Sequence, residues 1–550
     1  MQLKVTTVDG RVTDIAITPG DTLARAIYLS GAFAPRPLCS GLGNCGLCRV
    51  RFLSAPPAAT PKDEAVLGSE DVAKGWRLGC RHQAAPGDEV LLPPDALQNT
   101  DVAKTAHADA AHSGTTPAAP APKTLALAVD LGTTSLVWSA CEPGGATVAQ
   151  GRELNPQIGA GSDVLSRLSA AMTPGGSARL QKATLDALRR ILAGLPAPVS
   201  RICLAANTAM TALTRGASVQ GLAAAPYGLE FHGHCEENLP GLPPIYFPPQ
   251  AAPFIGGDIS AGMAALLRQN PEFPFLLADM GTNGEFVLAL APEESLAVSV
   301  PLGPALEGIG LSCGALAGVG GEKNVITAFS LTPTGLQPVC VNVEDDTKNT
   351  DPQTRATETG AAHYSGISGT GYLSLVHILR NLDLVREDGR FNESPVLPLA
   401  QKLTRDLRIH AGQMELELPG KLRLTGTDIE EILKVKAAFS LALHSLLRAA
   451  RLTPADLQSC CLAGALGRHV RVDDLFALGF FPAALKADKV KAVGNTALAG
   501  AELMLADPGA RDLAAQWTAG TRVLNLTKDN TFMQLYLNHM RFSFPAHDQN

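Results

Sequence analysis

The chain has 550 residues, 46% of them hydrophobic and 18% charged, and a net charge of −7 at pH 7. This length is too great for one hydrophobic core and predicts a globular protein of three or four domains. The acidic balance gives no reason to expect nucleic acid or an anionic membrane as a partner. Gly (53) and Pro (39) are numerous enough for many tight turns and phosphate-binding loops.

The first residues, MQLKVTTVDGRVTDIAI, contain neither the basic segment nor the apolar run of a signal peptide. Apolar stretches elsewhere are short and interrupted by glycine or charge, so we expect no membrane-spanning segment. The eleven cysteines, without a secretory signal, indicate a reducing, cytoplasmic compartment. In such a compartment clustered thiols bind metal rather than form disulfides.

Residues 1–94 are predicted to form the first domain. Apolar and polar residues alternate on both sides of an Asp9-Gly10 turn, which predicts a β-hairpin. A short helix should follow and begin at Asp21 or Thr22, residue types that favour the N-cap position. The expected elements are strands at residues 5–8 and 12–17, a helix at 24–29 and a last strand near 90–92.

Residues 95–123 change composition abruptly. They are rich in Ala, Pro, Ser, Thr and Gly and contain almost no large apolar side chains, so they cannot bury enough surface to fold. This composition predicts a flexible linker that lets the modules on either side move relative to each other.

Four cysteines of the first domain have the spacing of an iron–sulfur site: Cys39, Cys45, Cys48 and Cys80. A [2Fe–2S] cluster needs four thiolates, here three from one tight loop and one from a distant segment. Zinc is the main rival, although structural zinc sites usually pair two C-x2-C knuckles and this domain has one. Glycines between the first three cysteines allow the positive φ that wrapping backbone N–H groups around sulfur often requires. These glycines are Gly41, Gly43 and Gly46. Over residues 1–94 the chain resembles the β-grasp ferredoxins with C-x5-C-x2-C spacing.

From Leu125 onward, apolar strands alternate with helical patterns, which predicts a mixed or parallel sheet flanked by helices. The expected strands cover residues 125–129, 136–140, 202–205, 275–278, 286–290 and 461–462, and the expected helices cover 180–194, 371–383 and 428–450.

Two turns in this body share one pattern, in which an Asp ends an apolar strand and x-Gly-Thr leads into the next strand. Backbone N–H groups and Thr hydroxyls of such a turn bind phosphate oxygens, and the Asp holds Mg²⁺, usually through water. Simple turn capping by each Asp is the structural alternative. The turns comprise Asp130, Gly132, Thr133 and Thr134, and later Asp279, Gly281, Thr282 and Asn283.

A third element follows the strand near residue 461. Its glycines would let a base and ribose lie against the backbone, and the next helix would add the positive end of its dipole. These residues are Gly464, Gly467, Gly494 and Asn495. In this order the three elements resemble the actin/sugar-kinase/Hsp70 (ASKHA) superfamily. The resemblance implies ATP between two RNase H-like lobes, a middle lobe at residues 124–274 and a C-terminal lobe at 275–550.

Three further positions have both a functional and a structural interpretation. Asp258 could position the water that attacks ATP, or it could cap the helix that begins near Ile259. Glu307 could line the nucleotide cleft, or it could anchor its own loop by hydrogen bonds. The pair Asn207-Thr208 could touch phosphate or a partner, or form a local turn.

Seven short phrases make the resemblance more specific, and together with the cysteine motif they are similar to the reductive activators of corrinoid proteins. The resemblance implies an ATP-dependent, one-electron reduction of an inactive Co(II) corrinoid protein to the Co(I) form used in methyl transfer. It also implies an upstream low-potential reductase and allows a homodimer. The phrases are Asn155-Pro156-Gln157, Gly161-Ser162-Asp163-Val164, Asn207-Thr208-Ala209-Met210, Gly256-Gly257-Asp258, Asp279 to Glu285, Gly303 to Gly308 and Gly366 to Gly371.

One position departs from this family, which commonly has Cys where this chain has Ser368, so the electron acceptor could differ. Two other functions therefore stay open. The first domain could be an electron-transfer subunit for another acceptor, with the ATPase-like body as a scaffold. The protein could also be a small-molecule kinase that a ferredoxin domain regulates. Intact Asp130 and Asp279 argue against a degenerate scaffold.

Overall fold

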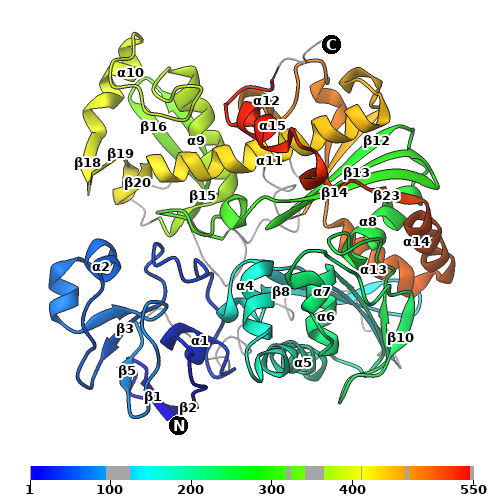
Figure 1. The fold of residues 1–550 in the computed structure, drawn as a ribbon, viewed down its shortest axis with the longest axis horizontal. Helices are drawn as coiled ribbons and strands as arrows, with labels where there is room; N and C mark the ends of the chain where they lie inside the picture. Colours follow the sequence, from blue (N-terminus) through cyan, green and yellow to red (C-terminus); the bar gives the residue numbers. More distant parts are fainter. Residues whose placement is uncertain are drawn as a thin grey trace, which may run out of the picture. The chain divides into compact units, whose positions relative to one another are not determined.

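The computed structural model describes residues 2–93, 124–316, 324–340, 364–410, 412–464 and 470–545 (Figure 1). The predicted linker, residues 95–123, and the predicted site residue Gly467 lie outside the described residues. The chain divides into two compact units. The first combines Met1–Ala265 with Ala497–Thr518, and the second combines Leu266–Thr496 with Ala519–Asn550.

The N-terminal part of the first unit is a mixed sheet with strand order β2-β1-β5-β3-β4. The predicted hairpin is confirmed, because β1 and β2 pair antiparallel on either side of Gly10, whose φ is +82°. Strand β5 then runs parallel to β1. The strands are β1 (Gln2–Thr6), β2 (Val12–Ala16), β3 (Arg49–Phe52), β4 (Trp76–Leu78) and β5 (Glu89–Leu91).

Two helices accompany this sheet. Helix α1 (Leu23–Tyr28) begins at Thr22, whose side chain accepts a hydrogen bond from Arg25 N–H, so Thr22 rather than Asp21 is the cap. Helix α2 (Pro61–Ala73) was not anticipated from the sequence, although Thr60 and Asp63 form a capping box around Pro61. That pattern is a standard helix start and could have been recognised.

The second sheet of the first unit has the order β10-β11-β9-β6-β7-β8. Its central strand β6 (Leu125–Leu131) pairs antiparallel with β7 and parallel with β9. Alternate residues of β6 face opposite sides, as a strand dictates. Leu127 and Val129 pack on α4, α5 and α6, which lie together on one face in Figure 1. The other strands are β7 (Ser135–Cys141), β8 (Thr147–Leu154), β9 (Val199–Ala206), β10 (Cys235–Glu237) and β11 (Ile245–Phe247).

The opposite face of this sheet is covered by helices from two distant parts of the chain. Ala126 and Ala128 pack there against α8 and against α13 and α14. A Cβ added to Gly500 of α13 would meet Ala261 O of α8 at 2.0 Å, so these helices touch backbone to backbone. The sequence had assigned α13 and α14 to the C-terminal lobe. The helices are α4 (Val164–Ala171), α5 (Gly176–Gly194), α6 (Thr208–Arg215), α7 (Gln220–Ala223), α8 (Gly257–Leu267), α13 (Thr496–Ala506) and α14 (Pro508–Gly520).

The main sheet of the second unit, β22-β21-β12-β13-β14-β23, repeats this topology. Strand β12 pairs antiparallel with β13 and parallel with β21, as β6 does with β7 and β9. The internal two-fold repeat suggested by the two Asp turns is therefore present in the strand order. The strands are β12 (Phe275–Met280), β13 (Asn283–Ala291), β14 (Glu294–Pro301), β21 (Ser459–Ala463), β22 (Val490–Gly494) and β23 (Thr521–Val523).

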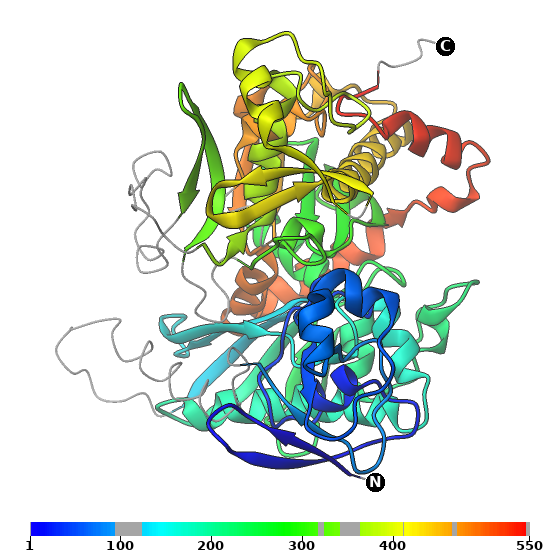
Figure 2. The same ribbon diagram turned by 90° about the vertical axis from the view of Figure 1, so that its left-hand side faces the viewer.

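Helix α11 (Gly426–Ala450) is the centre of the second unit's core. Its Phe439 makes edge-on ring contacts with Phe286, Phe480 and Phe481 at centroid distances of 5.0, 5.3 and 5.1 Å. Two small sheets extend this unit, and Figure 2 shows β15 and β16 as a green hairpin at its edge. Its other elements are β15 (Val325–Thr332), β16 (Gly335–Cys340), β17 (Gly366–Ile367), β18 (Leu407–His410), β19 (Gln413–Leu418), β20 (Leu422–Thr425), α9 (Gly369–Asn381), α10 (Pro398–Leu403), α12 (Val472–Ala477) and α15 (Phe532–His539).

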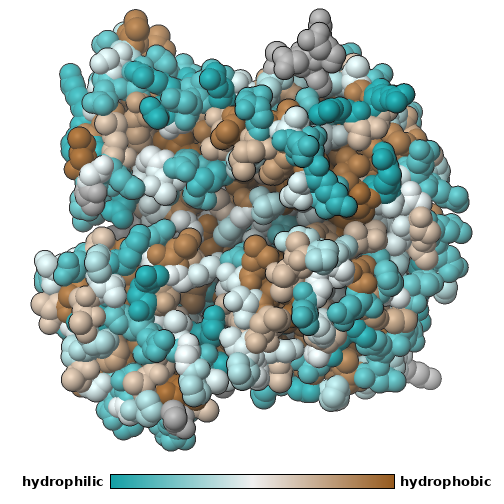
Figure 3. All heavy atoms as spheres, in the orientation of Figure 1, coloured by the Kyte–Doolittle hydropathy of each residue, from teal (hydrophilic) through white to brown (hydrophobic). Residues whose placement is uncertain are grey.

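Hydrophilic groups cover much of the face in Figure 3. Exposed large hydrophobic side chains among the described residues include Val396, Leu397 and Ile409. Among the described residues, no helix has both the length and the apolar character needed to cross a bilayer.

A buried lysine makes the stability of the second unit depend on pH. Lys436 of α11 is fully buried and donates to His539 O (3.1 Å) and to Ser543 O. Burial lowers its pKa from 10.5 to about 7, although nearby Glu387 opposes this shift. Between these two pKa values the unfolded chain binds more protons than the folded one, so stability rises with pH in that window and is lowest below it.

We therefore expect the melting temperature of the wild type to rise, relative to that of Lys436→Met, as pH increases from 7 to 9.5. Calorimetry of both proteins across this range measures the difference. Lys434→Met is the matched control, because Lys434 is partly exposed and its ion pairs with Glu430 and Glu431 raise its pKa. A difference that does not change with pH would contradict the titration of Lys436.

Candidate functional site

The four predicted cluster cysteines come together as two pairs. Cys39 and Cys45 lie within hydrogen-bonding reach of each other, and so do Cys48 and Cys80. The pKa of Cys39 falls to about 5 because it accepts from the Cys45 thiol, and from the backbone N–H groups that surround it, against the effect of burial. The pKa values of Cys45 and Cys48, the donors in the two pairs, are raised by these contacts and by burial.

The backbone around these sulfurs has the predicted left-handed turns. Gly41, Gly43 and Gly46 have φ values of +83°, +72° and +70°. Asn44 N–H donates to Cys39 Sγ at 3.4 Å. A Cβ added to Gly79 would meet Cys48 O at 2.8 Å, so only glycine lets the Cys80 segment approach the loop this closely. The loop therefore wraps backbone donors around sulfur as an iron–sulfur site requires.

The number and pairing of the thiols bear on the two metals considered for this loop. A structural zinc site needs four ligands around one ion. A two-iron cluster instead takes two protein ligands on each iron. Three thiols from the loop and one from the Cys80 segment, arranged as two pairs, match the number of donors that a [2Fe–2S] cluster takes.

A buried hydrogen bond between an aspartate and a histidine, which the sequence did not reveal, supports the Cys80 segment. Asp63 of α2 accepts from Leu78 N–H (2.7 Å) and pairs with His82 Nε2 (2.8 Å). Burial raises the pKa of Asp63, but these hydrogen bonds and those from Thr60 outweigh it and keep the pKa below its usual value. The contacts fix the chain on both sides of Cys80.

The first Asp turn is held by side chains from three other segments. Asn155 Nδ2 donates to Gly132 O (2.6 Å), and Asn207 Nδ2 donates to Thr133 Oγ1 (3.1 Å). Arg167, fully buried on α4, donates to Thr133 O. The two asparagines lie in the phrases singled out from the sequence, whereas Arg167 was missed. An arginine in an otherwise apolar helical stretch was the available signal.

Asp258 lies beside Asp130. Its side chain accepts from Ile259 N–H at 2.8 Å, but α8 already begins at Gly257, so Asp258 lies in the first turn of the helix and does not cap one that begins near Ile259. Burial, together with the negative charge of Asp130, raises its pKa to about 7. This position suits a group that takes a proton near neutral pH.

The second Asp turn lies at the end of β12 in the second unit. Gly281 N–H donates to Asn283 O at 3.0 Å and closes the turn. Thr282 Oγ1 donates to Glu307 at 3.0 Å, so Glu307 anchors this loop by a hydrogen bond. That contact is the structural alternative considered for Glu307.

The predicted adenosine element meets this second turn. Asp279, Ala463 and Gly494 lie in register across the parallel strands β12, β21 and β22. Gly464 has φ +87°, and an added Cβ would meet Asp279 Oδ1 at 2.7 Å and Met280 O at 2.8 Å. The carboxyl ends of parallel strands are where ligands bind in open α/β sheets. The structure thus brings Asp279, Gly464 and Gly494 together, and Asn495 follows at the head of α13.

Ser368 has a structural role. It is the N-cap of α9, and its Oγ accepts from Gly371 N–H at 3.2 Å. A Cβ added to the neighbouring Gly369 would meet Leu306 O at 1.8 Å, so α9 begins directly against the Gly303–Gly308 turn. Serine is a favoured N-cap residue.

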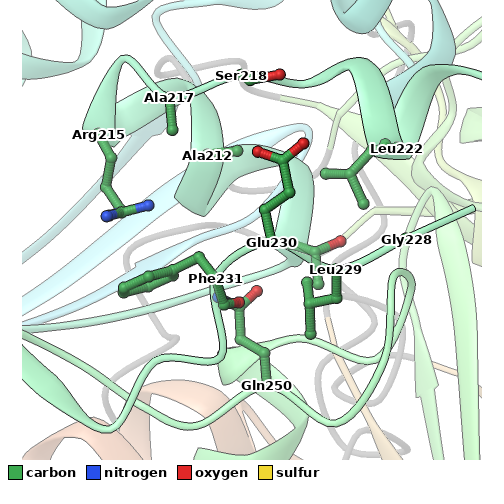
Figure 4. Close-up of a pocket in the computed structure, with 12 residues that line it drawn as sticks. Ala212, Arg215, Ala217, Ser218, Leu222, Gly228, Leu229, Glu230, Phe231 and Gln250 are labelled. Atoms are coloured by element: carbon green, nitrogen blue, oxygen red, sulfur yellow. The ribbon is translucent and has the colours of Figure 1, made fainter.

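A separate cavity of about 160 Å³ lies between α6, α7 and residues 228–231 (Figure 4). Gln250 lines it, is 2% exposed, and its Oε1 has no hydrogen-bond partner. Arg215, also on its wall, is held by Glu237 and lies over the Phe231 ring. Thr208, considered for contact with phosphate or a partner, also lines this cavity, whereas the four predicted cluster cysteines do not.

Comparisons with known proteins agree with this geometry. A solved structure, "Reductive activator for corrinoid,iron-sulfur protein", matches 98% of this chain and 98% of its own with a TM-score of 0.65 and 20% identity, which establishes the fold. The model for the "C-terminal domain of RACo the ASKHA domain" matches residues 274–549, and that for the "RACo middle region" matches 125–268. The chain belongs to the RACo family.

Two curated relatives also match this chain. "Corrinoid activation enzyme RamQ" of Eubacterium limosum is 25% identical over 451 residues, which cover 76% of this chain and 70% of the relative. "[Co(II) methylated amine-specific corrinoid protein] reductase" of Methanosarcina barkeri is 27% identical over 322 residues, 56% of this chain and 52% of the relative. The chain thus spans about half the length of this second relative.

The contact between Gly464 and Asp279 gives a direct test of the nucleotide site. Gly464→Ala places a Cβ against Asp279 and forces alanine into a left-handed conformation, so we expect adenine-nucleotide affinity to fall at least about tenfold, equivalent to about 1.4 kcal/mol. Isothermal titration calorimetry measures the dissociation constant. Gly426→Ala is the control, because its added Cβ has only Met414 O within 4 Å, at 3.9 Å. Unchanged affinity in Gly464→Ala would contradict a nucleotide at this junction.

Proposed function

We propose that this protein is an ATP-dependent reductive activator that returns an inactive Co(II) corrinoid protein to Co(I). One observation carries the proposal. A single chain of the RACo family contains four cysteines arranged as two pairs, and it also contains two Asp turns on two sheets of the same topology. The finer assignment is a β-grasp [2Fe–2S] domain at residues 1–94, a linker at 95–123, and ATPase lobes at 124–274 and 275–550.

The electron is carried at the N-terminal domain. Cys39, Cys45, Cys48 and Cys80 would hold a [2Fe–2S] cluster, which supplies a one-electron centre when bound. One electron leaves this domain and converts Co(II) to Co(I), and an upstream low-potential reductase replaces it. The buried Asp63–His82 pair keeps the Cys80 segment in place during this exchange.

The lobes bind Mg²⁺–ATP. Backbone N–H groups and hydroxyls of the two turns would bind phosphate oxygens, Asp130 and Asp279 would hold the Mg²⁺, and Asp258 would position the attacking water. The adenosine lies against the third element. The phosphate residues are Gly132, Thr133, Thr134, Gly281, Thr282 and Asn283, and the adenosine residues are Gly464, Gly467, Gly494 and Asn495.

Coupling to ATP is needed because the transfer is uphill. Plant-type clusters have potentials near −400 mV, and an acceptor about 100 mV lower makes one electron cost about 2 kcal/mol. Nucleotide-driven changes in binding are of this size. Eleven cysteines that are all free thiols support a reducing, cytoplasmic setting. We also propose that the active form is a homodimer, on the family resemblance.

The reaction itself separates the candidate functions. The protein is purified anaerobically and reduced, and the visible spectrum of a Co(II) corrinoid protein is followed with and without Mg–ATP. Co(I) that forms only with ATP supports the proposal. Equal formation without ATP would instead support an electron-transfer subunit with a scaffold body, and phosphorylation of a metabolite without Co(I) would support a kinase.

Two variants should separate electron transfer from ATP hydrolysis. Cys80→Ser should abolish Co(I) formation while leaving ATP affinity unchanged, because it removes one of four thiolates and no nucleotide contact. Asp279→Asn should keep the visible absorption of the cluster but lower ATP hydrolysis by about 10²-fold. Cys235→Ser, a thiol on β10 outside the cluster loop, is the control. Loss of the cluster in Asp279→Asn, or full activity in Cys80→Ser, would contradict these roles.

A further inference from the structure

The cysteine-bearing domain is packed on the middle lobe of the same unit. A Cβ added to Gly159, in the loop before α4, would meet the carbonyl carbon and Cβ of Tyr28 at 2.9 Å. Leu29 packs against the lobe's hydrophobic core. Gly159 therefore permits helix α1 to approach the lobe at backbone distance, and the two parts share a defined contact rather than a loose one.

The cluster loop itself takes part in this contact. Ser40, directly after Cys39, donates from Oγ to Asp163 Oδ2 at 2.7 Å. The same Oγ accepts from Ser162 N–H at 2.8 Å and lies 2.7 Å from Ser162 Oγ. Ser40 has a φ of +48°, an uncommon conformation for a non-glycine residue. One residue of the cluster loop is thus fixed by two consecutive residues of the lobe.

An ion pair forms the second anchor. Arg179 of α5 donates to both carboxylate oxygens of Asp21, at 2.8 and 3.1 Å, and to Thr18 Oγ1 at 3.3 Å. The side chain of Asp21 is 5% exposed and that of Arg179 is 28% exposed. Removing Arg179 leaves the Asp21 carboxylate buried without its opposite charge, which strongly disfavours the contact.

The segment that holds Ser40 also holds the first Asp turn. Arg167 donates from Nε to Gly161 O (2.9 Å) and from its guanidinium to Thr133 O. Its positive charge also acts on the carboxylate of Asp163. A continuous path therefore runs from Cys39–Ser40 through Ser162–Asp163 and Arg167 to Thr133.

We propose that nucleotide binding at the first Asp turn and docking of the cysteine-bearing domain are thermodynamically coupled through residues 161–167, with Ser40, Asp163 and Arg167 as positioning residues. The inference rests on the proposed nucleotide site. Coupling is reciprocal, so nucleotide must change the docking equilibrium by the same factor by which docking changes nucleotide affinity. The nucleotide state of the lobe would then set when the domain is held and when it is available to an electron acceptor.

A charge swap tests the docking contact in the full chain. Asp21→Arg and Arg179→Asp each place like charges together, and the double variant restores an opposite pair. Hydrogen exchange at Ser162 N–H reports docking directly, because that group donates to Ser40. We expect exchange at least about tenfold faster in each single variant and restored protection in the double variant. Lys182→Asp is the matched control, a like change on an exposed residue of the same helix.

The coupling is measured by repeating both readouts with Mg–ADP. We expect ADP to change Ser162 exchange in the wild type by about fivefold or more, and the single variants to bind ADP with an affinity changed by the same factor. The double variant should return to wild-type affinity. Arg167→Met, which keeps the apolar stem but has no donor for either carbonyl, should keep docking but lose the effect of ADP.

The possible failures are distinct. Absence of ADP binding by the wild type would overturn the proposed function, and this coupling with it. Binding of ADP that leaves Ser162 exchange unchanged, with equal affinities in docked and undocked proteins, would overturn the coupling alone. Single variants that exchange no faster than Lys182→Asp would show that the domain does not dock in solution, which also overturns it.

Discussion

The arrangement of each lobe follows from one constraint, the pairing of a central strand with an antiparallel neighbour on one side and a parallel neighbour on the other. The antiparallel partner forces a tight turn directly after the Asp. The parallel partner must end at the same edge of the sheet. In the first unit Asp130 is thus in register with Ala205, and Asn207 begins α6 beside Thr133. In the second, Asp279 is in register with Ala463, and Gly464 follows. Polar groups distant in sequence meet because the strands end together.

The cysteine loop depends on a different, local constraint. Glycines in the left-handed conformation, and the close approach of the Gly79 backbone to the loop, bring together cysteines that are unevenly spaced in the sequence. The four thiols then lie as two pairs. These features were readable in advance because spacing and glycine content lie within a few residues of each other. The buried Asp63–His82 support was not readable, because it joins an unrecognised helix to a segment nineteen positions away.

The same distinction explains the rest of what the sequence predicted and missed. Hairpins, apolar strands and the two Asp turns are set by local alternation and turn chemistry, and their positions agree with the structure within a few residues. Helices α13 and α14 lie on the first sheet because small residues such as Ala126 and Gly500 allow close packing there. These residues are hundreds of positions apart in the sequence, so no local periodic pattern predicts the contact. Arg167 was missed for a related reason. Its role is to donate hydrogen bonds to two carbonyl groups, and these lie close to it only in the folded chain.

The polar character of the contact at Ser40 and Asp21 bears on how the protein could work. Each intramolecular hydrogen bond contributes only about 1 kcal/mol net, because the same groups bond to water when separated. The hydrogen bonds and the ion pair of this contact are therefore specific in geometry yet modest in free energy. Coupling free energies of about 1–3 kcal/mol suffice to shift an equilibrium of this kind. An apolar interface of the same extent would hold the two parts together more strongly. The contact described here is weak enough for nucleotide binding to change the position of the cysteine loop.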